Sequence, residues 1–330
     1  MSTTSSTSSG LRTWSALAAR KRRPTEYEVV TYDLHYRTRN PDAPYELDPD
    51  LFMNRWYKRH ANAVRLQHDD WNAFRDPDEL VYRTYTAMQD AAEEYVDRLL
   101  DEHDRAGHDR TLDPAWVATL ARLYTPGRYP LHAVQMASAY LAQMAPASTI
   151  TNCAVFQEAD AFRWVSRTAY RTCELGKSHP GAGFGAERAV WEDDSAWQGF
   201  RELFERTLVA WDWDEHLVAL TLVAKPALDE TWVRQLGAAA RACGDGLLAM
   251  LHDAQLRDAE RARRWTGALV RFACERPGNA AIVDDVLAAW APLGERAIDA
   301  FCAALPNATR AAAEAKTATR TFRAELGFAR

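Results

Sequence analysis

The sequence predicts an all-α fold, and three features of the residue pattern lead to this prediction. From residue 76 onward, apolar residues recur at the spacing of an amphipathic helix. Proline and glycine fall mainly between these runs, where helices start and stop. No segment alternates polar and apolar residues for more than a few positions, as a strand would. We therefore predict a single helical domain over residues 76–330.

Two segments precede this domain. Residues 1–23 are rich in Ser and Thr, basic and free of acidic residues, so they cannot bury enough surface to fold, and we expect a mobile tail. An organelle transit peptide would show the same bias. Residues 24–75 combine four prolines with many aromatic residues and show no sustained period. They are predicted to form an extended, irregular arm.

The arm has two interpretations: it folds back over its own helices, or at least part of it lies on another chain. Structureless stretches of this length are uncommon unless they are functional, and aromatic residues are enriched in interface cores. Both observations favour the second interpretation. The residues expected to contact a partner are Tyr36, Tyr45, Trp56, Tyr57 and Trp71.

Capping signals predict the first helices of the domain. Asp76 is a candidate N-cap, with Pro77 at the first helical position and Glu79 where a capping box would place it. Asp113 and Pro114 repeat this signal for a short helix. The ranges predicted for the long helices are 76–108, 131–144 and 148–175.

Proline and glycine are expected to separate the later elements. The Gly-rich segment 178–187 lacks the spacing of a phosphate-binding loop and is predicted to be a surface loop. A helix that begins at Asp194 should end at Lys225-Pro226, and a longer region should bend near Gly244. An Ala-, Arg- and Thr-rich tail should close the chain. The predicted helical ranges are 194–223, 229–275, 280–290 and 294–305.

Composition and charge exclude several classes of function. The formal net charge is −6, and the 40 basic residues are scattered among 46 acidic ones, so no basic surface for nucleic acid is expected. No apolar run approaches the ~20 residues that span a bilayer. The five cysteines are isolated and form no C-x-x-C pair, which argues against disulfides and a zinc site. We expect a cytoplasmic protein.

A bundle of long helices is typical of the ferritin-like class, whose di-iron centres use inward Glu residues and two Glu-x-x-His pairs. The spacing matters because residues three apart lie on one helix face. No glutamate in this chain is followed by histidine at the third position. Asp212 and His216 lie four apart, but a lone pair of this kind is more often a surface pair than a metal site. The sequence therefore predicts a ferritin-like bundle that lacks the di-iron site.

Other candidate residues are explained by structural roles. The chain has no G-x-S-x-G elbow and no H-E-x-x-H motif. His132 is expected to be a core or capping residue. The stripe of Trp197, Trp211 and Trp213 is expected to lie in the core and not around a cofactor. The charged run of residues 258–264 is most simply a solvated helix face.

Several blocks of sequence carry a resemblance to a known family. They are RTWSALA (12–18), LHYRTRNPDAPYELDPD (34–50), DDWNAFRDPDELVYRTY (69–85), QMASAYLAQMAPASTITNC (135–153) and DAQLRDAERARRW (253–265). These blocks resemble the hydroxylase beta subunit of bacterial multicomponent monooxygenases, in particular its toluene and phenol monooxygenase branch. The resemblance covers nearly the whole chain.

This resemblance implies a hydroxylase assembled from two copies each of alpha, beta and gamma subunits. The system also contains a reductase, usually a ferredoxin as well, and a small effector protein. Alpha and beta subunits are both similar to ferritin-type bundles, and only alpha carries the di-iron cofactor. No metal ligand, catalytic residue or cofactor is therefore expected in this chain.

The resemblance also places the missing ligands. Alpha's first Glu-x-x-His box is aligned through Ala145-Pro146, and its second box through Asp258. The aligned positions are Ala159 and Phe162 in the first box and Ala259 and Ala262 in the second. We expect these residues to lie on inward helix faces, where small and apolar side chains fill the space of the metal centre. A shift of register by one residue would not restore the missing ligand pair.

We predict a non-catalytic structural subunit. It would support the di-iron alpha subunit, which inserts an oxygen atom into aromatic hydrocarbons. The alternatives are an independent helical metalloenzyme with unusual ligands and a helical scaffold unrelated to oxygenases.

Overall fold

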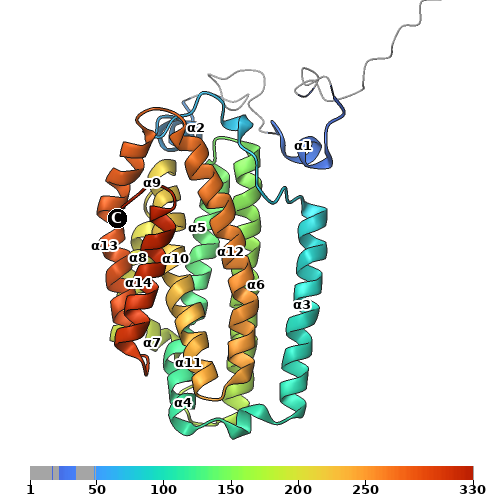
Figure 1. Cartoon of the computed structure of the whole chain (residues 1–330), viewed down its shortest axis with the longest axis vertical. Helices are drawn as coiled ribbons and strands as arrows, with labels where there is room; N and C mark the ends of the chain where they lie inside the picture. Colours follow the sequence, from blue (N-terminus) through green and yellow to red (C-terminus); the bar gives the residue numbers. More distant parts are fainter. Residues whose placement is uncertain (1–16, 18–21, 35–47, 49, 330) are drawn as a thin grey trace, which may run out of the picture.

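The computed structural model describes residues 17, 22–34, 48 and 50–329 of the chain. In this part of the chain every regular element is helical, which confirms the all-α prediction. The long helices run side by side, up and down the molecule (Figure 1). The α-helices, long and short, are α1 (Glu26–Thr31), α2 (Phe52–Tyr57), α3 (Tyr82–Arg105), α4 (Pro114–Thr119), α5 (Arg128–Met144), α6 (Ser148–Ser178), α7 (Glu187–Asp193), α8 (Ser195–Thr207), α9 (Trp213–Val218), α10 (Lys225–Leu228), α11 (Leu236–Ala242), α12 (Gly246–Cys274), α13 (Asn279–Cys302) and α14 (Ala308–Ala324).

Four helices meet at the centre of the bundle. Residues of α5, α6, α10 and α12 line one small internal cavity. Helices α8, α13 and α14 pack on one side of this centre, and α3 stands at the other side (Figure 1). Among the described residues, no helix is both long and apolar enough to cross a membrane.

Pro226 does not end its helix, contrary to the prediction. Helical structure continues from Trp213 to Ala242 because wide π-type turns, Ala219–Ala224 and Asp229–Gln235, flank α10. A proline inside a helix leaves the carbonyl four residues earlier without its usual donor. That carbonyl, on Leu222, accepts a hydrogen bond from Nη1 of the buried Arg323 at 3.3 Å. A residue of α14 thus compensates for the proline.

The C-terminal part is also more regular than predicted. The two shorter helices expected at 280–290 and 294–305 form the single helix α13, with Pro292 inside it. The expected tail contains the helix α14, which buries Ala311, Ala315 and Phe322 against the bundle. Small side chains at helical spacing allow this close packing, so the composition of the segment reflects a packed helix.

The start of α3 lies six residues beyond the predicted N-cap. Asp76 is buried, and its carboxylate accepts hydrogen bonds from the backbone N–H groups of Asp78 and Leu80, at 3.0 and 3.2 Å. Glu79 follows in the left-handed region, with φ 46°. The Asp76 side chain therefore closes a turn, and the helix begins only at Tyr82.

Other boundaries differ less. Asp113 caps α4 by accepting a hydrogen bond from the Ala115 N–H at 2.8 Å, as predicted. The region expected to bend near Gly244 is instead two helices, α11 and α12, because Gly244 is left-handed and Asp245 caps α12. The short helix α7 was not predicted.

The arm is not wholly irregular, because α1 and α2 are short helices within it. Its Tyr36 and Tyr45 lie outside the described residues, as does nearly all of the tail predicted for residues 1–23.

Candidate functional site

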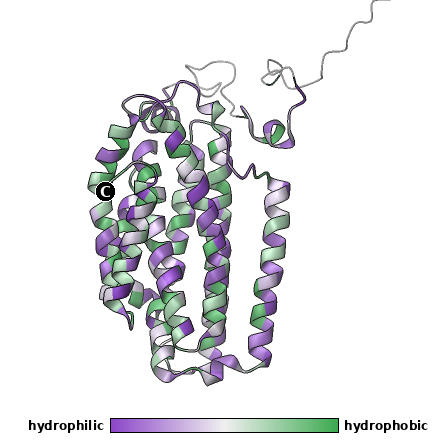
Figure 2. Cartoon of the chain, viewed as in Figure 1, coloured by the Kyte–Doolittle hydropathy of each residue, from purple (hydrophilic) through white to green (hydrophobic). Residues whose placement is uncertain are grey.

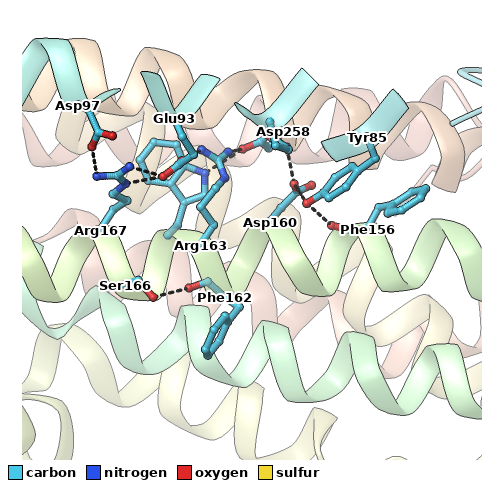
Figure 3. A network of polar contacts seen from close by, with 12 residues as sticks. Tyr85, Glu93, Asp97, Phe156, Asp160, Phe162, Arg163, Ser166, Arg167 and Asp258 are labelled. Carbon is cyan, nitrogen blue, oxygen red and sulfur yellow. Dashed lines mark hydrogen bonds and ion pairs between the residues drawn. The ribbon is translucent and has the colours of Figure 1, made fainter. Parts of the chain in front are cut away.

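Helix α6 carries charged side chains among the buried apolar ones on its inner side and exposes apolar side chains on its outer side. Asp160 and Arg171 are buried, whereas Phe162 is 59% exposed. Figure 3 shows Phe162 and Ser166 on the side of α6 opposite Arg163 and Arg167. The prediction that Phe162 helps to fill the interior is therefore wrong for this chain.

Two copies of the motif Asp-Ala-x-Arg face each other at the centre of the bundle. One copy is Asp160 to Arg163 on α6, and the other is Asp258 to Arg261 on α12. Arg163 pairs with Asp258, and Arg261 pairs with Asp160. Arg261 also contacts Asp258, with 2.9 Å between Nη2 and Oδ1. We call Asp160, Arg163, Asp258 and Arg261 the charge quartet.

Neutral donors satisfy the remaining capacity of the two carboxylates. The Tyr85 hydroxyl donates to Asp160 at 2.8 Å. Gln89 Nε2 donates to both carboxylates, at 2.7 Å for Asp160 and 3.1 Å for Asp258. Trp164 Nε1 donates to Asp258 at 2.8 Å. A buried ion pair is stable only when such additional hydrogen bonds are made, and here they come from α3 as well as α6.

The two carboxylates differ in acidity. Burial, together with the neighbouring Asp258 charge, raises the pKa of Asp160 to about 6. Burial alone would raise the pKa of Asp258 as well, but Arg163 and Arg261 hold it below its ordinary value. Both groups are therefore ionised at neutral pH, and the quartet carries two negative and two positive charges.

The network continues from the quartet to α3. Arg163 Nη1 lies 2.5 Å from the Glu93 carboxylate, and Arg167 Nε donates to the same carboxylate at 2.7 Å. Arg167 also pairs with Asp97 at 2.5 Å. Figure 3 shows this row of charges between α3 and α6. These contacts tie α3 to the bundle and fix its position along α6.

The residues at this centre do not fit a di-iron site. Arginine has no free lone pair and stays protonated, so Arg163 and Arg261 would repel a metal cation instead of ligating it. Across the described ranges, no group of three or more His, Cys, Asp or Glu side chains could hold a metal ion. Nearby, Lys225 already pairs with Asp229 at 2.7 Å.

The space at the centre is also too small for an organic substrate. The cavity between α5, α6, α10 and α12 has a volume of about 20 Å³. One water molecule needs at least 10–15 Å³, whereas a cavity that binds benzene is nearer ~150 Å³. The cavity can therefore hold a water molecule but not an aromatic ring.

The four positions aligned with metal ligands have different environments. Ala259 and Ala262 are buried, as expected, and Ala259 lines the central cavity. Ala159 is only partly buried and Phe162 lies on the surface of this chain. The physical reason is that the inward face of α6 carries Asp160, whose charge is neutralised from α12.

Two other sequence predictions also need correction. The charged run 258–264 is not a solvated face, because Asp258 and Arg261 are buried in the quartet. His132 is exposed and is neither a core nor a capping residue. The sequence signal that could have revealed the quartet is the Asp-Ala-x-Arg motif, which occurs once in α6 and once in α12.

Asp212 and His216 do not form a pair. His216 is buried, and its two ring nitrogens lie 3.0 and 2.8 Å from the carbonyl oxygens of Ala210 and Ala137. Asp212 instead contacts His60 Nδ1 at 2.6 Å. Of the tryptophan stripe, Trp197 and Trp213 are buried in the core, as predicted, whereas Trp211 is partly exposed.

The aromatic residues of the arm that the structure describes contact their own bundle. The Trp56 ring lies 4.8 Å from the ring of Trp211. Tyr57 accepts a hydrogen bond from Gln143 of α5. Trp71 packs edge-on against Trp213, with 5.4 Å between ring centroids. The described part of the arm thus folds back over the helices.

Comparisons with known proteins agree with the sequence resemblance. A family model described as methane, phenol and alkene hydroxylase matches residues 45–277. Subunit beta of the hydroxylase component of the toluene-4-monooxygenase system of Ectopseudomonas mendocina is 50% identical over 298 residues, which cover 90% of this chain and 91% of the relative. The small subunit of the propane 2-monooxygenase hydroxylase component of Mycolicibacterium smegmatis (strain ATCC 700084 / mc(2)155) is 24% identical, covering 91% of this chain and 82% of the relative.

Solved structures give the same result. A chain of toluene 4-monooxygenase, solved with toluene bound in its resting active site, is 50% identical and superposes with a TM-score of 0.86. The match covers 89% of this chain and 97% of that chain. A chain of phenol hydroxylase from Pseudomonas sp. OX1 has the same fold at 21% identity, with a TM-score of 0.85 and coverage of 96% and 95%. The matches in sequence and fold together show that this chain belongs to the methane, phenol and alkene hydroxylase family.

Proposed function

We propose that this chain is a non-catalytic beta subunit in the hydroxylase component of an aromatic monooxygenase. Its half-identical relative is a hydroxylase subunit beta of a toluene-4-monooxygenase system. By analogy, the reaction would be the insertion of one oxygen atom of O2 into an aromatic hydrocarbon. The catalyst would be an alpha subunit that holds the di-iron centre.

The observation that carries this proposal is the charge quartet. In a di-iron bundle, facing helices supply carboxylates and histidines to two cations. Here α6 and α12 supply two carboxylates and two permanent cations, Arg163 and Arg261. The guanidinium groups neutralise the carboxylates without a metal, and the remaining volume excludes an aromatic substrate.

The contribution of this chain to catalysis would be mechanical. The quartet holds α6, α12 and α3 in fixed register, which gives a rigid bundle against which alpha can pack. A rigid support keeps metal ligands and a substrate pocket in place in a neighbouring subunit. We further propose an assembly with two copies each of alpha, beta and gamma in the cytoplasm, served by an effector protein and by a ferredoxin and reductase.

Partner contacts of the arm are part of this proposal. Tyr36, Tyr45, Trp56, Tyr57 and Trp71 would lie at or near the alpha interface. An independent metalloenzyme is the main rival, and membership of the hydroxylase family argues against an unrelated helical scaffold.

Metal analysis of separated subunits tests this proposal. The chain should be expressed alone and together with the alpha and gamma subunits, and iron should be measured per polypeptide. We expect no stoichiometric iron and no toluene oxidation with this chain alone, and iron with activity only when alpha is present. Near-stoichiometric iron in the isolated chain, or turnover by it, would overturn the proposal.

A further inference from the structure

Three buried side chains at the centre of the bundle each have one polar atom without a partner. The exposed fraction is 2% for Gln157 of α6, and 5% and 3% for Gln255 and Trp265 of α12. Oε1 of both glutamines and Nε1 of the tryptophan form no hydrogen bond within the described part of the chain. A buried polar atom that lacks a hydrogen bond destabilises the folded state, so these three atoms need an explanation.

The three side chains line two small cavities. Gln157 and Gln255 line the central cavity between α5, α6, α10 and α12, which has a volume of about 20 Å³. Gln157 and Trp265 line another cavity of about 10 Å³, together with Asp76 and Arg261. We call these the first and the second cavity. Gln157 is thus shared by both.

The size and charge of the cavities restrict what they can bind. One water molecule needs at least about 10–15 Å³, so the first cavity has room for one and the second is at the lower limit. Around the first cavity, the carboxylates of the charge quartet are neutralised by its arginines, and Asp229 pairs with Lys225 at 2.7 Å. No net charge is left there to hold an ion. Cavities that stay dry are lined by apolar groups, and the first cavity is not.

The hydrogen-bonding capacity of the three atoms is specific. Gln157 Nε2 donates to Ser138 Oγ of α5 at 2.9 Å, which leaves its oxygen as the free end of the amide. The two glutamine oxygens only accept, so the first cavity requires a molecule with two donors. Trp265 Nε1 only donates, so the second cavity requires an acceptor, and a metal cation has no lone pair to offer. Water supplies two donors and two acceptors and meets both requirements.

We propose that each cavity binds one ordered water molecule and that Gln157 joins the two. The first water donates to Oε1 of Gln157 and of Gln255. It accepts from the Lys225 ammonium, which has two protons besides the one given to Asp229. The second water accepts from Trp265 Nε1 and donates to Gln157 Oε1. A carbonyl oxygen has two lone pairs, so this one atom can accept from both waters.

The two waters extend the hydrogen-bond network at the bundle centre. The first water joins α10 to α6 and α12, and Gln157 adds α5 through its bond to Ser138. All four helices around the first cavity are then connected beside the charge quartet. Buried waters of this kind are part of the structure and costly to remove. The inference is independent of the proposed function, because every residue that it uses lies in this chain.

A high-resolution crystal structure of the native full-length chain, alone or in its complex, tests the proposal. We expect one peak about 2.8 Å from Oε1 of Gln157 and of Gln255, and a second about 2.9 Å from Trp265 Nε1. A metal ion would instead lie about 2.0–2.4 Å from the oxygens. Cavities without density, or a peak at the distance of a metal ion, would overturn the proposal.

Methionine variants of similar length test the shared role of Gln157. In crystals of Gln157→Met we expect both waters to be lost, and in Gln255→Met only the first. Gln198→Met is the control, because Gln198 of α8 lines neither cavity and bonds to the carbonyl oxygens of Trp191 and Asp194. It should retain both waters. Two waters at full occupancy in Gln157→Met would overturn the link between the cavities, and the native crystals test occupancy even if a variant fails to fold.

Discussion

The two sides of α6 depart from the usual arrangement of an amphipathic helix, because charged residues lie among the buried apolar ones on its inner side. Its inner side carries Asp160 and Arg163, whose charges are paired with α12, and its outer side carries Val155 and Phe162. Most helices place apolar residues toward the core and charges toward water. The inner charges are therefore held by partners within this bundle, whereas the apolar residues of the outer side are exposed on this chain.

Helix α3 provides the ordinary case. It buries Val96 and Leu99 and exposes acidic and basic residues, and Figure 2 shows hydrophilic and hydrophobic residues alternating along it. Its exposed pairs, such as Arg98 with Glu94, face solvent. The difference between α3 and α6 can be measured. Removal of a buried charge should lower the free energy of unfolding far more than removal of an exposed one.

Removal of Asp258 should have the largest effect. In Asp258→Ala, Arg163 and Arg261 would remain buried without a shared carboxylate, and we expect the free energy of unfolding to fall by about 3–5 kcal/mol. Asp253→Ala is the matched control, because Asp253 lies on the same helix and forms an exposed pair with Arg241 at 2.7 Å. Urea unfolding should show a loss below about 1 kcal/mol for the control. Equal losses would contradict the account of the quartet.

The second prediction concerns pH. Burial lowers the pKa of His252 to about 3 in the folded chain, whereas an unfolded histidine titrates near 6.5. Below pH 6.5 the unfolded state therefore binds a proton at His252, whereas the folded state does not. The free energy of unfolding falls as pH decreases. Between pH 6.5 and 5 the loss from this residue should be about 1.6 kcal/mol.

His252→Leu should reduce this dependence, as measured by urea unfolding at several pH values. The buried His216, whose pKa is also lowered by burial, should maintain part of the slope. If the free energy of unfolding of His252→Leu depends on pH as steeply as that of the native chain, His252 is not neutral in the folded chain.

A hydroxyl deletion gives a smaller effect. Tyr85→Phe removes one donor from Asp160 but leaves Arg261 and Gln89 in place, so we expect a loss of about 1.5 kcal/mol. Tyr95→Phe, on the same helix and partly exposed, should change stability by less than about 0.5 kcal/mol. Thermal unfolding of both variants should show the larger loss of stability for Tyr85→Phe. An equal loss in Tyr95→Phe would contradict the role given to the bond between Tyr85 and Asp160.

Two adjacent glutamates of α3 give the finest comparison. Glu93 bridges Arg163 and Arg167, whereas Glu94 forms only an exposed pair with Arg98 at 3.4 Å. We expect Glu93→Gln to lose about 1 kcal/mol and Glu94→Gln less than about 0.5 kcal/mol. Hydrogen exchange along α3 should rise in the first variant only. Similar exchange in the two variants would mean that α3 is not held by this network.

Much of the fold could be predicted because its signals are local. The Asp113 cap, the extents of α5 and α6 and the absence of strands each follow from neighbouring residues. The continuation through Pro226 could not be predicted, because the donor that replaces its N–H is on Arg323, which lies 101 residues from the acceptor Leu222. Asp76 was misread although its partners are local, because an Asp-Pro pair whose carboxylate closes a turn looks the same in the sequence as a helix start.

The site was misread for a related reason. The alignment through Ala145-Pro146, supported by the rule that apolar residues point inward, put Phe162 in the core and shifted the face of α6 by one residue. A buried charge reverses that rule only when its partner is on another helix, and the partner of Asp160 is Arg261 on α12, 101 residues away. The absence of Glu-x-x-His was readable from the sequence, but the four paired charges were not.

Anomalous diffraction at the iron edge, from crystals of the whole hydroxylase, tests the central claim most directly. The account predicts an anomalous peak in the alpha subunit and none between α6 and α12 of this chain, with Arg163 and Arg261 bonded to Asp258 and Asp160. An iron peak beside Asp160 and Asp258 would contradict it.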